Sequence, residues 1–373
     1  MKIVFIGGRD IRILGGIENY MYNLATQVVR LGHEAVVYCE SDHNGTEWVN
    51  GFKVVSMKGP KSNLLCKPWV SLKATLRTIF REKGVSLIHY NAWPPALWSW
   101  MARLCGIPTL LEGHGHEWQR SKYSPRQQRI LKRMERLTAR TNRNLIMCSE
   151  SQTRYFKAHY GRDAVTVPTA VNLPPAEAPQ SDILARYELT PGRFFLSMGR
   201  LVPDKNPDYL IQGFLEAGLT GWKLVIAGSN DALPDYVARL HALGEGHPEV
   251  VFTGAVYGAD KDCLLRNAAL FCLPSTIEGL SIVLLEAMSY RRPILASDID
   301  ANREVLRPET ALWVRPEQAD DIARELRRAS ETPDFTEAVE TNYALVSGHY
   351  TWERVAAGYL QHVQTLIRKR DQR

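Results

Sequence analysis

The sequence predicts an α/β protein with parallel sheets, divided into two domains. Segments with the patterns of buried strands alternate with segments of helical period along the chain. The clearest pairs are Lys2–Ile6 with Glu18–Leu31, and Leu224–Ala227 with Pro234–Leu243. A length of 373 residues suits two domains of ordinary size. A stretch rich in proline and small residues, at positions 168–181, marks the boundary between them.

Charge is divided unevenly between the two halves. Residues 1–170 contain 25 Lys and Arg against 12 Asp and Glu, whereas residues 171–373 contain 21 against 28. The formal net charge of +6 therefore combines a basic first domain of +13 with an acidic second domain of −7. Such an asymmetry indicates that the two domains bind different partners.

Cysteine usage and hydropathy predict a cytoplasmic protein. The 6 cysteines show neither C-x-x-C pairs nor zinc-site spacing, which favours a reducing compartment. The apolar run at Met1–Ile6 is too short for a signal peptide and is typical of a first buried strand. No run of about 18 apolar residues is present, so we expect no transmembrane helix.

The first strand leads to two glycine pairs. Gly7 and Gly8 are expected to end the strand, and Gly15 and Gly16 precede the first helix. Glycines before a helix let backbone N–H groups approach a phosphate closely, but a plain strand-to-helix turn is an equal alternative. The spacing matches neither G-x-G-x-x-G nor G-x-x-x-x-G-K-[ST], which argues against a dinucleotide or P-loop site.

Two aromatic and histidine segments follow strands in the first domain. The segment Asn91-Ala92-Trp93-Pro94-Pro95 could form a wall that stacks on a sugar ring, or simply pack the core. The segment His114-Gly115-His116-Glu117 begins at the end of a strand. Its H-x-H spacing lacks a third convergent ligand, so we expect no metal. For His116 a structural role is the leading interpretation.

A basic helix is predicted within residues 120–143. Ser124 and Pro125 have the character of an N-cap and a first helical residue. Cations recur at steps of three and four beside an apolar stripe, and only Glu135 opposes their charge. The cations are Arg126, Arg129, Arg133, Arg136 and Arg140, and the stripe is Ile130, Met134, Leu137 and Thr141. We expect an acidic partner, such as an anionic leaflet, at roughly 1 kcal/mol per cation; no nucleic-acid module is recognisable.

The second domain carries two cations after a buried strand. Phe194–Met198 predicts the strand, Arg200 and Lys205 come just past its end, and Pro207 is expected to start a helix. Ligands bind at the carboxyl ends of parallel strands. Arginine offers a fork of donors to phosphate oxygens and lysine a movable charge.

Two carboxylates farther along the chain complete the pattern. Glu278 and Glu286 are separated by seven residues and flank the turn Gly279-Leu280-Ser281. If that turn opens a helix, both acids lie near a helix N-terminus whose free N–H groups suit a phosphate. A nucleotide sugar requires carboxylates that accept hydrogen bonds from its hydroxyl groups, beside a pocket that binds its diphosphate. The spacing alone is a weak signal, and its combination with Arg200 and Lys205 strengthens it.

Together these motifs resemble those of the retaining GT-B glycosyltransferases, a family that includes phosphatidylinositol mannosyltransferases and bacterial polysaccharide glycosyltransferases. The likeness covers essentially the whole chain, with the motifs in the family's order. They are Gly15-Gly16-Ile17-Glu18, His114-Gly115-His116-Glu117, Gly199-Arg200 with Lys205, Gly254-Ala255-Val256, and Glu278 with Glu286. The resemblance implies two Rossmann-like domains facing a central cleft. It also implies that the domains span 1–170 and 171–355, with a helix at about 356–373 that returns to the first.

The resemblance also implies roles for individual residues. Arg200 and Lys205 would stabilise the departing diphosphate, and His114 would contact the donor sugar. Gly15, Gly16, Gly279, Leu280 and Ser281 would supply backbone contacts to the donor. Glu278 would grip sugar hydroxyls, Glu286 the ribose hydroxyls, and Ala255 and Val256 would border the base. No metal or other cofactor is expected.

We therefore predict a retaining hexosyltransferase that uses an NDP-sugar, with UDP favoured. Its acceptor would be a saccharide, lipid-linked, in cell-surface polysaccharide synthesis at the inner face of the membrane. Two alternatives stay open: an NDP-sugar epimerase on the same fold, and a non-catalytic module that binds a nucleotide sugar or a membrane.

Overall fold

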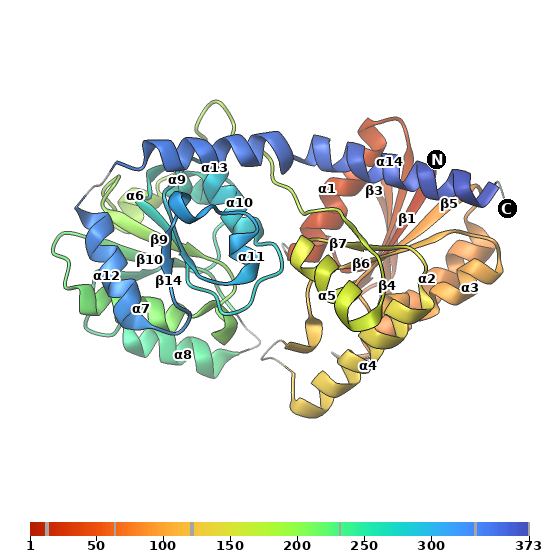
Figure 1. The fold of residues 1–373 in the computed structure, drawn as a ribbon, viewed down its shortest axis with the longest axis horizontal. Helices are drawn as coiled ribbons and strands as arrows, with labels where there is room; N and C mark the ends of the chain where they lie inside the picture. The colour runs from red at the N-terminus through yellow and green to blue at the C-terminus, as the bar shows by residue number, and fades with distance from the viewer. Residues whose placement is uncertain (12–14, 63–64, 120–122, 231–232, 332–333, 372–373) are drawn as a thin grey trace. The chain divides into compact units, whose positions relative to one another are not determined.

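The computed structural model describes residues 1–11, 15–62, 65–119, 123–230, 233–331 and 334–371, apart from the side chains of Glu117 and residues 369–371. It contains two compact units (Figure 1). Unit 1 comprises Met1–Ala170 and Trp352–Arg373, and unit 2 comprises Val171–Thr351. The chain passes back into unit 1 four residues earlier than expected, because the last helix already starts at Trp352.

Unit 1 contains an eight-stranded sheet with the order β3-β4-β2-β1-β5-β6-β7-β8. All neighbouring strands are parallel except β3, which pairs antiparallel with β4 at the edge. The strands are β1 (Lys2–Arg9), β2 (Glu34–Ser41), β3 (Gly45–Val49), β4 (Phe52–Lys58), β5 (Val85–Asn91), β6 (Thr109–Gly113), β7 (Leu145–Met147) and β8 (Val165–Thr166).

Helices cover both faces of this sheet. They are α1 (Gly16–Arg30), α2 (Cys66–Arg81), η1 (Pro95–Trp98), α3 (Ser99–Leu104), η2 (Glu117–Gln119), α4 (Pro125–Thr141), α5 (Glu150–Tyr160) and α14 (Trp352–Asp371). Successive strand residues point to opposite faces, so Phe5 packs with α1 and α14 while Val4 packs with α2. In Figure 1 the blue helix α14 runs beside α1. The C-terminal helix thus packs into the same hydrophobic core as the N-terminal strand and helix.

Strand β1 continues to Arg9 and does not end at Gly7-Gly8 as expected from the sequence. The pairing with β2 shifts between Ile6 and Gly8, which marks a bulge, and Gly7 has a φ of +129°. A Cβ atom at Gly7 would lie 2.4 Å from the backbone oxygen of Asn91. Glycine is thus required here for conformation and for the close approach of β5.

Unit 2 contains a six-stranded parallel sheet with the order β11-β10-β9-β12-β13-β14. The strands are β9 (Phe194–Met198), β10 (Lys223–Ala227), β11 (Val250–Phe252), β12 (Leu270–Leu273), β13 (Ile294–Ser297) and β14 (Leu312–Val314). The order reverses direction between β9 and β12, which is the point where doubly wound sheets bind ligands.

The helices of unit 2 lie on both faces of its sheet. They are α6 (Ile183–Arg186), η3 (Pro203–Lys205), α7 (Pro207–Ala217), α8 (Pro234–Leu243), α9 (Gly258–Asn267), α10 (Ile282–Ser289), α11 (Asp300–Arg303), η4 (Pro308–Thr310), α12 (Ala319–Ser330) and α13 (Thr336–His349). Buried residues of α7 and α12 pack on one face, and those of α9 and α10 pack on the other. Two Rossmann-like domains with parallel sheets are therefore confirmed.

Candidate functional site

Two loops of unit 2 bring the predicted cations and acids together. We call residues 199–206 the cation loop and residues 274–281 the acid loop. They follow β9 and β12, which are neighbours in the sheet, so both loops leave the same edge. Asn206 ties them: its amide nitrogen donates to the Pro274 oxygen at 2.9 Å and to the Thr276 hydroxyl at 2.8 Å. The Thr276 N–H donates to the Asp204 oxygen at 3.0 Å.

Within these loops Lys205 forms an ion pair with Glu278. The Glu278 side chain is only 7% exposed, whereas Lys205 retains 27% exposure and Arg200 is exposed at the start of the cation loop. A carboxylate this deeply buried is stable because a cation neutralises it. The structure therefore brings Lys205 and Glu278 into contact, and places Arg200 on the same loop.

A third loop supports the cation loop from the other side. Gly199 has a φ of +149°, and its N–H donates to the Ala227 oxygen at 3.0 Å. A Cβ atom at Gly228 would lie 1.8 Å from the Gly199 oxygen. Only glycine at 228 allows the backbones after β9 and β10 to approach this closely, so the position of Arg200 is fixed by backbone contacts.

Helix α10 presents its N-terminus and Glu286 beside the acid loop. Gly279, Leu280 and Ser281 immediately precede it, and no side-chain hydrogen bond caps the helix at Ser281. The first N–H groups of α10 therefore suit an anion, and Glu286 lies in the second turn, as the spacing predicts. Glu286 is 17% exposed, so its carboxylate is accessible for hydrogen bonding.

The second acid also has a cationic partner, which sequence reasoning missed. The Nζ atom of Lys261 lies 2.8 Å from Oε1 of Glu286, joining α9 to α10. Helix α9 follows the loop that contains Ala255 and Val256; Ala255 is exposed, and Val256 packs partly against the core. One feature of the sequence could have indicated this contact: Lys261 lies one turn into the helix that follows the loop predicted to border the nucleotide base.

In unit 1 the turn before α1 is shaped by Glu18. Gly15 is the residue before the helix and Gly16 its first residue. The Glu18 carboxylate accepts a hydrogen bond from the Arg9 backbone N–H at 2.9 Å. The Glu18 side chain also lies against Gly15, where a Cβ atom would be only 2.1 Å from Oε2 of Glu18. Residues 12–14 of this turn lie outside the described residues. The glycine at 15 thus makes room for a side chain that ties the strand to the helix.

His114 follows β6 and lies against a buried polar cluster. Its Nε2 atom lies 3.3 Å from Oδ1 of Asn91 and 3.8 Å from Oε2 of Glu112, and its ring packs edge-on against Tyr20. Glu112 is fully buried, and its Oε2 also lies 2.9 Å from Nε2 of buried His89, at ion-pair distance but without full hydrogen-bond alignment. Burial raises the pKa of Glu112 and lowers that of His89, so both groups tend toward their neutral forms.

His116 has a structural environment. Its Nδ1 lies 3.2 Å from Oε2 of Glu135, which also accepts from Trp118 at 3.1 Å and, through Oε1, from Tyr160 at 2.8 Å. Glu135 is completely buried, so the expectation that it opposes the cationic face of α4 is wrong. The helical register turns position 135 inward, where three donors satisfy the carboxylate.

The remaining face of α4 also differs from the expected pattern. The buried residues are Leu131, Glu135, Thr138 and Ala139, whereas Ile130 and Leu137 of the expected apolar stripe are 39% and 53% exposed. Ser124 caps the helix as predicted, forming a capping box with Gln127. Arg120 lies outside the described residues. The described part of α4 thus exposes apolar side chains beside its cations.

The aromatic segment after β5 belongs to the core. Trp93 is 2% exposed and stacks on Phe156 with ring centroids 4.8 Å apart, so it cannot form a wall for a sugar. Its indole N–H donates to the Gly115 oxygen at 3.4 Å and so supports the loop that carries His114.

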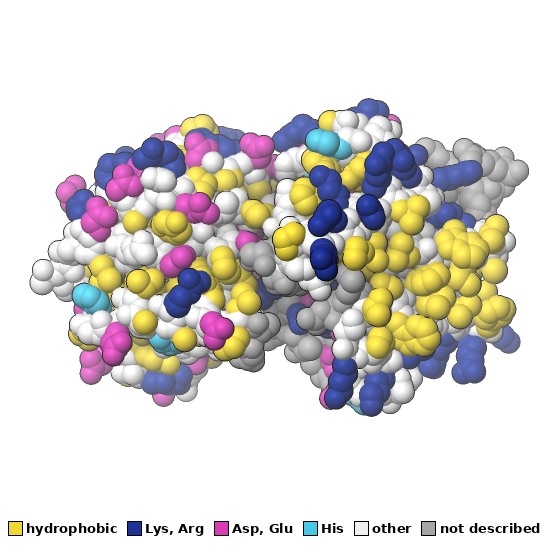
Figure 2. All heavy atoms as spheres, turned by 90° about the horizontal axis from the view of Figure 1, so that it is seen from below, with side chains coloured by type: hydrophobic (Ala, Val, Ile, Leu, Met, Phe, Trp, Pro, Cys, Tyr) yellow, Lys and Arg dark blue, Asp and Glu magenta, His cyan; other side chains and the backbone are white. Residues whose placement is uncertain are grey.

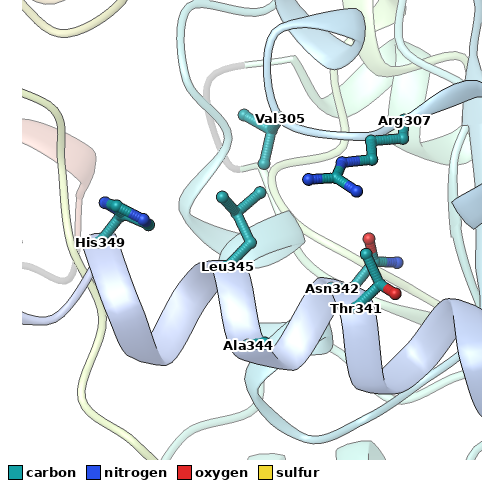
Figure 3. A pocket seen from close by; sticks show the side chains of 7 residues that line it. All are labelled: Val305, Arg307, Thr341, Asn342, Ala344, Leu345 and His349. Carbon is teal, nitrogen blue, oxygen red and sulfur yellow. The ribbon is translucent and has the colours of Figure 1, made fainter.

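A pocket of about 340 Å³ lies elsewhere in unit 2, between α13 and the segment that precedes η4 (Figure 3). Arg307 and Val305 face Asn342 and Leu345 across it (Figure 3). None of the residues predicted to bind a ligand lines it. Within the described ranges, no three His, Cys, Asp or Glu side chains are grouped to hold a metal ion.

Comparisons with known proteins agree with this arrangement. The family described as "Glycosyltransferase Family 4" matches residues 14–174, and "Glycosyl transferases group 1" matches residues 183–344. Among solved structures, a sucrose-phosphate synthase from Thermosynechococcus elongatus is 19% identical with a TM-score of 0.83, covering 99% of this chain and 100% of that one. A likeness at this identity shows the fold.

Curated relatives extend over most of the chain. An uncharacterized glycosyltransferase of Methanocaldococcus jannaschii is 28% identical and covers 92% of this chain and 93% of its own. A phosphatidyl-myo-inositol mannosyltransferase of Mycobacterium leprae is 31% identical over 320 residues, covering 82% of this chain and 81% of its own. The chain therefore belongs to the GT-B glycosyltransferase family, which includes phosphatidylinositol mannosyltransferases and polysaccharide glycosyltransferases.

Proposed function

We propose that this glycosyltransferase is a retaining enzyme that moves a hexose from an NDP-sugar to a saccharide acceptor. The nucleotide sugar binds at the cation and acid loops of unit 2, and the acceptor binds unit 1. Retention means that the new glycosidic bond keeps the anomeric configuration of the donor. The observation that carries the proposal is the contact of Lys205 with Glu278 at the carboxyl ends of β9 and β12, the edge where doubly wound sheets commonly bind ligands.

The charges of these loops fit the parts of a nucleotide sugar. Arg200 and Lys205 stabilise the charge that grows on the leaving diphosphate, a fixed electrostatic contribution that requires no metal ion. The N–H groups at Gly279, Leu280 and Ser281, at the start of α10, add to it. Glu278 accepts from sugar hydroxyls once the diphosphate engages Lys205.

Three positions border the nucleoside. Glu286 accepts from the ribose hydroxyls, and Ala255 and Val256 border the base. In unit 1, Gly15 and Gly16 supply backbone contacts, and His114 contacts the donor sugar. These roles follow the family resemblance of the motifs.

A UDP-hexose is the first donor to test, and GDP-mannose the second. The structure of HepE from Anabaena, with a TM-score of 0.76 and 17% identity, is described in complex with UDP-glucose and covers 98% of this chain and 100% of that one. A Mycobacterium tuberculosis relative, 26% identical over 92% of this chain and 93% of its own, is named as a GDP-mannose-dependent mannosyltransferase.

The surface of unit 1 supports a lipid-linked acceptor and a peripheral location at a membrane. Figure 2 shows hydrophobic side chains gathered on one face of unit 1, with Lys and Arg around them. Exposed large apolar residues of α2, α3 and α4 are Trp69, Phe80, Trp100, Leu104, Ile130 and Leu137. Aromatic and apolar groups beside cations suit an anionic bilayer interface. No helix in the described ranges is long and apolar enough to span a membrane.

Replacing Arg200 and Lys205 tests the proposal directly. Each single change to Ala is expected to lower kcat for sugar transfer by about 100-fold or more, because a preorganised charge at the leaving group is lost. Arg193→Ala serves as a control, since Arg193 precedes β9 at the opposite end of that strand. The anomeric configuration of the product, read by NMR, decides whether the reaction retains or inverts.

The same assay separates the alternatives. Near-parental kcat in both variants would contradict the assigned roles. Formation of an epimeric NDP-sugar without any acceptor would identify an epimerase, and binding without turnover would identify a non-catalytic module.

A further inference from the structure

The cluster beside His114 forms a continuous line of polar contacts through the core of unit 1. The Tyr359 hydroxyl lies 3.0 Å from Nδ1 of His89. Nε2 of His89 lies 2.9 Å from Oε2 of Glu112, and the same oxygen lies 3.8 Å from Nε2 of His114. Tyr359, His89 and Glu112 are all fully buried, and the His114 side chain is 12% exposed. The line thus leads from the interior to an accessible imidazole.

The members of this line come from distant parts of the chain. Tyr359 lies on α14, His89 on β5, and Glu112 on β6, with His114 just past the end of that strand. Their rings are also packed together: His89 stacks on Tyr359 with centroids 5.4 Å apart, and Tyr20 of α1 meets His114 at 4.9 Å. Tyr20 and Tyr359 themselves belong to the large hydrophobic core cluster of unit 1. Ionisable groups placed in such a core lower stability unless they are well paired, so their presence calls for a function.

We propose that Glu112, His89 and Tyr359 are positioning residues that hold the His114 ring in one orientation and one tautomer. The inference deepens the role proposed above for His114 and rests on that role. Through this line the last helix of the chain sets the geometry of a group that contacts the donor sugar.

The contacts specify which tautomer is held. Nε2 of His114 faces the Oδ1 atom of Asn91, which can only accept a hydrogen bond, and the Oε2 atom of Glu112. Nε2 therefore carries the hydrogen in neutral His114, and Nδ1 carries the lone pair. Glu112 and His89 are both fully buried, and burial favours the neutral form of each, which leaves the pair without net charge.

Histidine NMR of the full-length protein tests this line without any substrate. The variants are Glu112→Gln, which replaces the carboxyl beside His89 and His114 by an amide of similar shape, and Tyr359→Phe, which removes one hydroxyl that lies on His89 and not on His114. Long-range ¹H–¹⁵N correlation, with the signal assigned by His114→Gln, reads tautomer and pH titration. The titratable groups in the cluster are Tyr20 from α1, His89 from β5, Glu112 from β6 and Tyr359 from α14, with Cys148 after β7 acting on Tyr20.

We expect His114 in the unchanged protein to be the Nε2–H tautomer. Both variants should shift its ring signals and mix its tautomers, and kcat should fall about tenfold with little change in KM for the donor, because a loosened group is misplaced in the transition state. Tyr90→Phe is the matched control. It removes a buried hydroxyl from the strand position next to His89, but on the opposite face, where that hydroxyl meets Thr75 at 2.9 Å.

The outcomes separate this inference from the proposed function. Unchanged His114 signals in folded Tyr359→Phe would overturn the positioning line, whatever the enzyme's activity. Shifted signals in a protein that transfers no sugar would keep the line and reject the proposed role of His114. Should Glu112→Gln fail to fold, the single-hydroxyl variant still decides.

Discussion

The candidate site of unit 2 contains two acids, and each of them forms an ion pair with a lysine. Lys205 pairs with Glu278, and Lys261 pairs with Glu286. We expect the two ion pairs to respond differently when a donor binds. In the proposed donor complex, a diphosphate would compete with Glu278 for Lys205, whereas the ribose hydroxyls would approach Glu286 without displacing Lys261. We therefore expect Lys261 to hold the Glu286 carboxylate in the orientation that the proposed contact with ribose requires.

Replacing Lys261 by Met should weaken donor binding without affecting the chemical step. A carboxylate without its partner samples more rotamers, so we expect KM for the donor to rise about fivefold, roughly 1 kcal/mol, with kcat nearly unchanged. Discrimination between ribo- and 2′-deoxyribonucleotide donors should fall in parallel. Lys223→Met is the control, because Lys223 lies at the start of β10, at the end of the strand away from the cation loop. An unchanged KM and an unchanged discrimination would remove Lys261 from the site.

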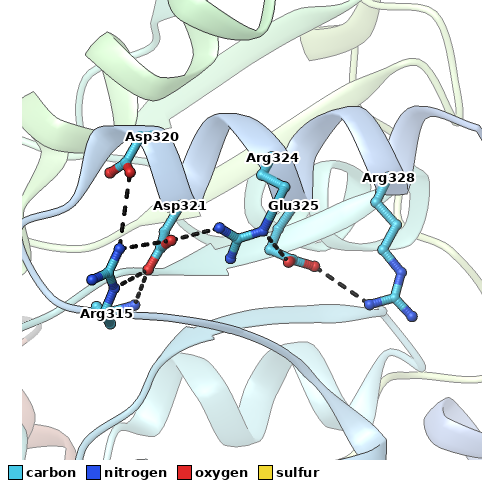
Figure 4. A network of polar contacts seen from close by, with 6 residues as sticks. All are labelled: Arg315, Asp320, Asp321, Arg324, Glu325 and Arg328. Atoms are coloured by element: carbon cyan, nitrogen blue, oxygen red, sulfur yellow. Dashed lines mark hydrogen bonds and ion pairs between the residues drawn. The ribbon is translucent and has the colours of Figure 1, made fainter.

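Helix α12 is joined to the segment that follows β14 by a chain of alternating charges (Figure 4). Asp321 is the centre of it. Its carboxylate lies 2.6 Å from Nε of Arg315 and 2.6 Å from Nη1 of Arg324, and it also accepts from the Arg315 backbone N–H at 3.2 Å. The Arg315 hydrogen bond, followed by that of Arg324, lowers the pKa of Asp321 well below its usual value, although burial opposes this.

This network predicts a pH dependence of stability. Because the folded pKa of Asp321 is depressed, its contribution is complete above the unfolded pKa near 4 and is lost as pH falls through the folded value. Asp321→Asn should lower the free energy of unfolding by about 1–2 kcal/mol at pH 7, a value reduced by the exposure of both arginines. The difference from the unchanged protein should shrink below pH 4.

Asp320→Asn is the matched control. Asp320 is 64% exposed and approaches Arg315 only at 3.9 Å, so its loss should hardly change the denaturant midpoint. The pairing of Asp321 would not stabilise the helix if both substitutions changed the free energy of unfolding equally. The same conclusion would follow if the loss of stability in Asp321→Asn persisted at low pH.

The basic half of the chain also carries the exposed apolar face. Arg133 and Arg136 are exposed on α4 together with Leu137, since Glu135 between them turns into the core. The acidic half lacks such an excess of cations. The proposed membrane contact therefore belongs to unit 1, and its strength should depend on salt because surface charges are screened.

Vesicle flotation measures this contact. Arg133→Gln with Arg136→Gln should weaken binding to anionic vesicles about 30-fold, at roughly 1 kcal/mol per cation, and Trp69→Ser should weaken it further. Arg328→Gln, an exposed arginine on unit 2, should leave binding unchanged. If the chain does not float with anionic vesicles even at low salt, the membrane proposal fails.

Sequence patterns predicted those features that depend on local order. The strand before Arg200, the start of α7 at Pro207 and the turn before α10 follow from local residue preferences. Contacts between distant segments could not be predicted in this way. Lys261 reaches Glu286 only because two helices pack side by side, and Tyr359 reaches His89 across 270 positions. The bulge at Gly7 and the inward turn of Glu135 depend on neighbouring strands and helices. The predictions that the strand ends at Gly7-Gly8 and that Glu135 opposes the surface cations were therefore wrong.

A crystal structure with a bound nucleoside diphosphate would locate the donor site of this protein. We predict that its phosphates lie within hydrogen-bond distance of Arg200 and Lys205, at the N-terminus of α10, with the ribose hydroxyls on Glu286. A diphosphate bound away from both loops, with the Lys205–Glu278 pair intact, would show that these loops do not form the donor site.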